Sequence, residues 1–137
     1  MIPDTSGGHF VGGAELAAGK YREAFNLFDD EANSMDHAEM FAGQEGNSKE
    51  VAQDDLTAAS NLAGAAAALF GAPTASFLEG KNGDTALKYL QDARERLASA
   101  SKAWPKPVTT TAVKDVRAYV DQLAKAKKPL LPDCWRR

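Results

Sequence analysis

Apolar residues recur along this chain at intervals of three and four, which is the spacing of one face of an α-helix. The pattern is found in four stretches, over residues 14–33, 48–70, 84–104 and 112–127. No stretch alternates apolar and polar residues with the β-branched composition of a strand. We therefore predict an all-α protein. Its four main helices are expected to form an up-and-down bundle, with one or two short helical turns and irregular N- and C-terminal arms.

The N-terminal part of the chain contains the first main helix and the glycine-rich segment before it. Gly19 weakens the first turns of the helix over 14–33, so its firm part is expected to begin at Lys20. Residues 1–13 contain four glycines and are predicted as an extended or loosely packed arm. A separate short helical turn is expected over 35–42.

The second main helix has the clearest signals for its two ends. Asn47 is followed three residues later by Glu50, which is the pattern of a reciprocal capping box. The helix is expected to end at about Phe70, because Gly71 and then Pro73 follow. Alanines leave two of its sides smooth, which would permit close approach by another helix.

The third main helix is predicted from an Asp84 cap to about residue 104. Asp92 and Arg96 stand four residues apart on its expected outer side. One seam has the alternating spacing of bundle packing, and it consists of Ala86, Leu90, Ala93, Leu97, Ala100 and Trp104.

The fourth main helix, over 112–127, follows two prolines and is expected to be capped from Thr109–Thr111. Between the second and third helices, a short turn over 74–79 is expected to bury Phe77 and Leu78.

One local pattern resembles a known repeat. Residues 19–24 followed by Phe28 resemble the second helix of a tetratricopeptide repeat, and residues 83–86 followed by Leu90 and Ala93 are similar. The alanines of the two segments, at positions 24 and 86, are 62 residues apart, whereas such repeats recur at about 34. The resemblance implies helical-hairpin packing and not membership of the family.

Composition places the chain among ordinary globular domains. It has 137 residues, of which 44% are hydrophobic and 26% are charged. Its single cysteine, Cys134, excludes an internal disulfide and a cysteine-rich zinc site. No apolar run approaches the roughly 18–20 residues of a membrane-spanning helix, and no secretory signal is visible. The mature form of a targeted precursor would also have no visible signal, because its targeting segment would have been removed. We expect one domain over 14–128, with an arm over 1–13 and a basic tail over 129–137.

Charge is distributed unevenly between the two halves of the chain. Residues 1–60 contain twelve acids and three bases, a net charge of −9. Residues 61–137 contain thirteen bases and seven acids, a net charge of +6. Either folding brings the halves together so that they neutralise each other, or the two charges form separate surfaces for a basic and an acidic partner.

An acidic cluster between Asp29 and Glu39 is the candidate metal site, with Asp30, Asp36, His37 and Glu39 as its possible ligands. A di-iron bundle requires paired Glu-x-x-His motifs, but Ser34 stands three residues before His37. The competing interpretation is a solvated acidic helix end that binds no metal, and no cofactor is predicted.

The sequence contains no catalytic motif of a known kind. A G-x-S-x-G elbow is absent, and the segment from Gly13 to Lys20 has one residue too many for a phosphate-binding loop. Nucleic-acid binding would depend on the C-terminal bases together with Trp135. Since the whole chain is acidic, a nucleic-acid partner is not expected.

These observations favour a non-enzymatic interaction module, such as an adaptor or an accessory subunit of a larger assembly, that binds a protein partner. The alternative is a metal- or cofactor-binding helical bundle that uses the Asp29–Glu39 cluster. The oligomeric state is left open. The expected partner-binding residues lie in the arm and near the C-terminus, and they are Phe10, Lys125, Lys127, Lys128, Trp135, Arg136 and Arg137.

Overall fold

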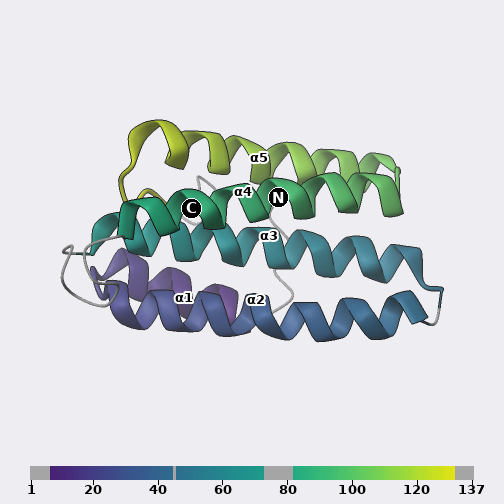
Figure 1. The fold of residues 1–137 in the computed structure, drawn as a ribbon, viewed down its shortest axis with the longest axis horizontal. Coiled ribbons are helices and arrows are strands. Elements are labelled where there is room, and N and C mark those ends of the chain that lie inside the picture. The colour runs from purple at the N-terminus through teal and green to yellow at the C-terminus, as the bar shows by residue number, and fades with distance from the viewer. Residues whose placement is uncertain (1–6, 45, 73–81, 132–137) are drawn as a thin grey trace.

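The computed structural model describes residues 7–44, 46–72 and 82–131, and these residues contain five helices and no strand (Figure 1). The prediction of an all-α protein is therefore confirmed. The helices from α2 to α5 run alternately up and down as a bundle, and the short α1 lies beside α2. Their bounds are α1 Gly7–Ala17, α2 Tyr21–Gln44, α3 Ser48–Gly71, α4 Asn82–Ala103 and α5 Pro107–Ala126.

A glycine turn separates α1 from α2. Gly19 has a φ of 78°, a conformation that favours glycine. The N–H of Lys20 donates to the carbonyl of Glu15 at 2.9 Å, and the N–H of Gly19 donates to that of Leu16 at 3.1 Å. These two bonds form a Schellman motif, which ends α1. The stretch over 14–33, predicted as one helix, is therefore divided, and α2 begins one residue after Lys20.

Both N-terminal helices extend beyond the predicted bounds. Residues 7–13, expected as part of an irregular arm, belong to α1. The turn expected over 35–42 is a continuous part of α2. Ser34 does not interrupt α2, because its hydroxyl donates back to the carbonyl of Asp30 at 3.1 Å within the helix.

The predicted N-cap of α3 is confirmed. The side-chain oxygen of Asn47 accepts a hydrogen bond from the N–H of Glu50 at 3.1 Å. In return, the side-chain amide of Asn47 donates to the Glu50 carboxylate at 3.2 Å. Asn47 thus supplies an acceptor for one of the N–H groups that have no helical partner in the first turn of α3, which begins at Ser48.

Replacing Asn47 by alanine is expected to lower the free energy of unfolding by about 0.5–2 kcal/mol, because the N–H of Glu50 loses its acceptor. Urea unfolding followed by circular dichroism measures this loss. Asn47→Gly is the control, and it should cost only a few tenths of a kcal/mol. Equal losses for the two variants would show that the cap does not stabilise α3.

The last two helices begin earlier than the sequence indicates. α4 begins at Asn82, so Asp84 lies in the first turn and is not its cap. α5 begins at Pro107, because proline is well tolerated at the first helical position, where its missing N–H has no helical acceptor. Lys106 is the extended N-cap residue, and Thr109–Thr111 lie inside the helix. The turn predicted over 74–79, with Phe77 and Leu78, lies outside the described residues.

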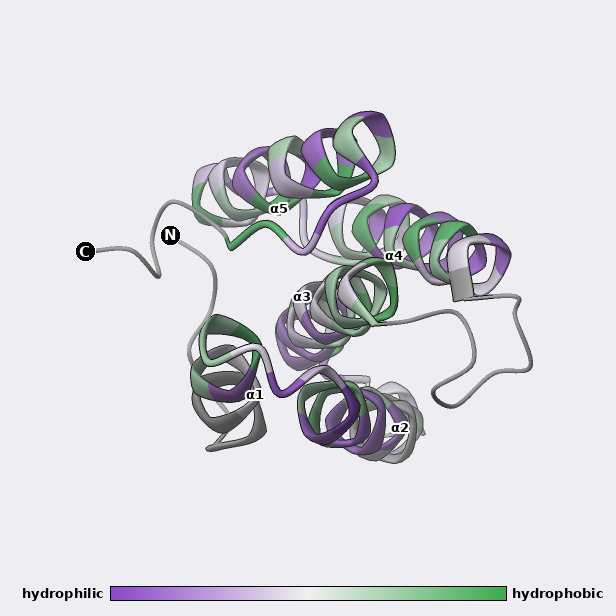
Figure 2. Cartoon of the chain, turned by 90° about the vertical axis from the view of Figure 1, so that its left-hand side faces the viewer, coloured by the Kyte–Doolittle hydropathy of each residue, from purple (hydrophilic) through white to green (hydrophobic). Residues whose placement is uncertain are grey.

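α3 is the central helix of the bundle, and it contacts all four of the others (Figure 2). Every residue from Leu56 to Leu69 is buried except Leu62, which is half-buried. A helix that is buried on all sides must be uncharged or internally paired along most of its length, and alanines make up half of the residues from Leu56 to Leu69. The smooth sides of this helix, which were expected to permit close approach by another helix, are covered by the protein's own helices.

The seam predicted on α4 faces this core. Leu90 and Leu97 are both fully buried, and Trp104 is partly buried against the core cluster. The described part of the C-terminal tail also packs on the bundle. Leu130 and Leu131 are half-buried, and the Tyr119 hydroxyl donates to the Leu130 carbonyl at 2.7 Å.

Candidate binding groove between α2 and α4

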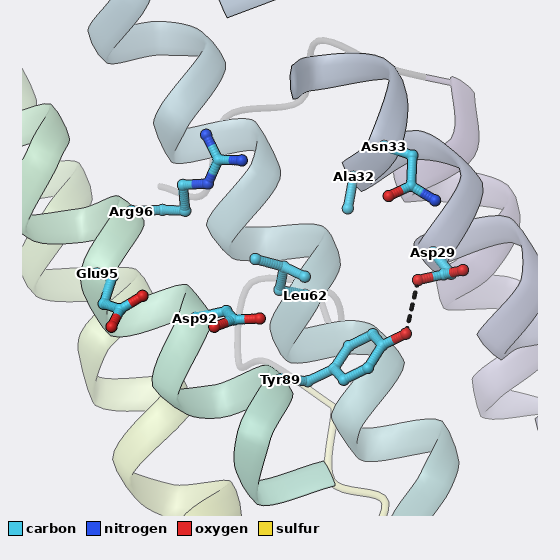
Figure 3. Close-up of a pocket in the computed structure, with 8 residues that line it drawn as sticks. All are labelled: Asp29, Ala32, Asn33, Leu62, Tyr89, Asp92, Glu95 and Arg96. Carbon is cyan, nitrogen blue, oxygen red and sulfur yellow. Dashed lines mark hydrogen bonds between the residues drawn. The ribbon is translucent and has the colours of Figure 1, made fainter. Parts of the chain in front are cut away.

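α2 and α4 each pack closely on α3, and a groove remains between them. Its floor is Leu62, the half-buried residue of the central stretch of α3. The groove has a volume of about 410 Å³, which falls within the usual range for ligand pockets. Its lining is shown in Figure 3 and consists of Asp29, Ala32, Asn33, Leu62, Tyr89, Asp92, Glu95 and Arg96.

Negative charge predominates in the lining. Asp29 projects from the α2 wall, whereas Asp92 and Glu95 project from the α4 wall (Figure 3). Arg96 is the cation in the described lining, and its guanidinium points away from Tyr89. The groove therefore offers carboxylates from two helices to a cation entering between them.

A hydrogen bond joins the two walls at one end of the groove. The Tyr89 hydroxyl donates to the Asp29 carboxylate at 2.7 Å (Figure 3). Burial, and then this hydrogen bond, raises the pKa of Tyr89 above its ordinary value, so the phenol stays protonated at neutral pH. The ring of Phe25 packs against the Tyr89 ring with centroids 5.7 Å apart, and this contact holds the aromatic wall in place.

An ion pair lies at the other end. Arg96 donates to Asp55 of α3 at 3.3 Å, and Asp55 is fully buried. Desolvation lowers the pKa of the Arg96 guanidinium from its ordinary value. Sequence spacing placed Arg96 beside Asp92 on the outer side of its helix. In the structure it reaches inward instead, because a buried carboxylate requires a partner more strongly than an exposed one does.

The metal hypothesis receives no support from the described side chains. Asp30 is exposed on α2. The side chains of Asp36, His37 and Glu39 lie outside the described residues. Among the side chains that are described, no group of three or more histidines, cysteines or acids is placed to hold a metal ion.

The expected partner-binding residues are not brought into the groove where the structure describes them. Lys125, Lys127 and Lys128 are exposed at the C-terminal end of α5. The side chain of Phe10 and residues 132–137, which include Trp135, Arg136 and Arg137, lie outside the described part.

Sequence reasoning missed the groove. Tyr89 and Asp29 are 60 residues apart, and neither belongs to a recognisable motif. A weaker signal was present, since Tyr89, Asp92 and Arg96 recur at intervals of three and four beside the apolar seam of their helix. Such a polar stripe ordinarily faces solvent, and only the position of α2 makes it a groove wall.

Comparisons with known proteins add no assignment. No protein-family model matches the chain, and neither a curated protein nor a solved structure is significantly similar to it. None of the described helices combines the length and apolar character required to cross a membrane.

Proposed function

We propose that the protein is a non-enzymatic interaction module that docks a basic segment of a protein partner against the α2–α4 groove. The observation that carries this proposal is the groove itself, whose lining includes three carboxylates from two helices. A partner with positive charge complements such a surface, which accelerates its encounter and fixes its orientation.

The acidic character of α2 supports the same choice of partner. Residues 21–44 contain six acids and one base in the sequence, so the α2 wall belongs to a strongly negative helix. The α4 wall contributes Asp92 and Glu95 to the same opening. The described lining therefore has three carboxylates and one guanidinium, so its formal charge is negative.

The chemistry of the lining favours binding over catalysis. Its described residues supply carboxylates, one amide, one phenol and one guanidinium. They include no histidine, cysteine or serine that would act as a nucleophile with an adjacent base. These groups accept hydrogen bonds and attract cations.

A capture experiment with matched variants tests the proposal. The variant Asp92→Asn/Glu95→Gln removes two negative charges from the groove. The control Glu23→Gln/Asp30→Asn removes two exposed charges of α2 that lie outside the groove lining. We expect a basic protein, captured from cells that make this chain, to be retained by the wild type and the control but lost from the groove variant.

The salt dependence of capture provides the second readout. Binding should weaken steeply between about 0.05 M and 1 M salt, where the screening length falls to about 3 Å. If the groove variant retains the same partners as the wild type, or if capture is insensitive to salt, the α2–α4 groove is not the docking surface.

A further inference from the structure

We infer that the group received by the groove is an arginine side chain, whose guanidinium lies against the Tyr89 ring between Asp29 and Asp92. This inference rests on the proposed function and deepens it by naming the chemical group that is bound. The two carboxylates project from opposite walls into the same volume (Figure 3). A cation between them therefore interacts with both helices at once.

The groove matches the two parts of an arginine side chain. Its apolar lining, Leu62 on the floor and Ala32 on the α2 wall, suits the three methylene groups of the stem. Its polar walls suit the charged head. The volume of about 410 Å³ leaves room for one such side chain and part of its backbone.

The hydrogen-bonding groups favour a guanidinium over an ammonium. The guanidinium is planar and has five donors in a fixed fork, which suits carboxylates placed on two sides. The Tyr89 hydroxyl uses its proton on Asp29, so its oxygen still has acceptor capacity. A lysine ammonium is more strongly hydrated and cannot stack as a plane on the Tyr89 ring.

The aromatic wall is fixed before a partner arrives. Tyr89 is held at its hydroxyl by Asp29 and at its ring by Phe25. A cation over a positioned ring gains an attraction that grows as water is excluded. Because no side chain must be reordered to present the ring, less entropy is lost on binding.

Arg96 determines which end of the groove receives the guest. It is seven residues from Tyr89 on the same helix, a separation of about 10 Å along the axis. Its guanidinium is paired with Asp55 and directed away from Tyr89. Repulsion from Arg96 therefore places the guest at the Tyr89 end, where Asp29 and Asp92 are the nearest charges in the described lining.

Peptide titration tests this assignment. The probes are three capped pentapeptides with two glycines on each side of arginine, lysine or citrulline, the neutral isostere of arginine. Their binding to ¹⁵N-labelled protein is followed by amide chemical shifts. We expect saturable shifts around residues 29–33 and 89–92 with the arginine peptide. Citrulline should bind at least about 10-fold more weakly, as expected when charge-assisted hydrogen bonds are lost.

Two single variants separate local from general attraction. Asp92→Asn should weaken the arginine peptide several-fold, whereas Asp30→Asn, an exposed change elsewhere on the acidic α2, should leave its affinity within about 2-fold. Circular dichroism verifies that both variants are folded. Equal weakening by the two variants, equal binding of arginine and citrulline, or tighter binding of lysine would each overturn the inference.

The outcomes also distinguish this inference from the proposed function. If the groove variant loses its captured partner but no arginine peptide shifts the groove amides, the module stands and the arginine assignment is wrong. If the groove variant still captures its partner and no arginine peptide shifts the groove amides, both proposals fail. Analytical sedimentation tests whether a second copy of this chain occupies the groove. Self-association of the wild type that is lost in Asp92→Asn would identify that copy as the occupant and overturn the inference.

Discussion

Replacing Phe28 by alanine is expected to lower the free energy of unfolding by about 3–5 kcal/mol, the range for large aromatic truncations in cores. Phe28 is fully buried, and its ring lies between α1 and α3. A Cβ atom added at Gly12 would lie 2.8 Å from this ring, and one added at Gly64 would lie 2.6 Å from it. Because two glycines make space for the ring, its removal leaves a cavity bordered by three helices. Denaturant unfolding measures the loss.

A double-mutant cycle is the control for this contact. Alanine is a better helix former than glycine by about 1 kcal/mol, so Gly64→Ala would ordinarily stabilise a helix. Here its methyl group would collide with Phe28, and we expect a net destabilisation. In the Phe28→Ala background, the same Gly64→Ala change should become stabilising. If Gly64→Ala stabilises the wild type, the ring is not confined as described.

Replacing Leu97 by alanine is expected to cost about 2–5 kcal/mol, because Leu97 is fully buried in the middle of the α4 seam. Thermal or denaturant unfolding measures the change. Leu87, on the same helix but 39% exposed, provides the matched control. Leu87→Ala should change stability by no more than about 0.5 kcal/mol. A loss of that small size for Leu97→Ala would contradict its place in the core.

Local chemistry made several features predictable from the sequence. Asn47 and Glu50 satisfy each other's hydrogen bonds within one turn, so the start of α3 needed no tertiary information. The burial of Leu90 and Leu97 followed from helical periodicity, since residues seven apart lie on the same face. Both inferences depend only on neighbours within a few residues.

Features that depend on distant residues were missed. The glycines of residues 7–13 disfavour a helix locally, yet α1 forms there, and Gly12 provides the close approach to Phe28 that a larger residue would prevent. Likewise, the hydrogen bond between Tyr89 and Asp29 unites segments 60 residues apart. Spacing along one helix contains no information about which other helix will face it.

The central position of α3 makes the described bundle indivisible. α1 and α2 precede it in the chain, α4 and α5 follow it, and all four bury part of their apolar surface on it. A cut on either side of α3 would leave one half without the helix that completes its core. A chimaera that contains only part of this chain would therefore separate helices from α3, on which they pack. We expect the bundle to fold in a fusion protein only when it is included as a whole.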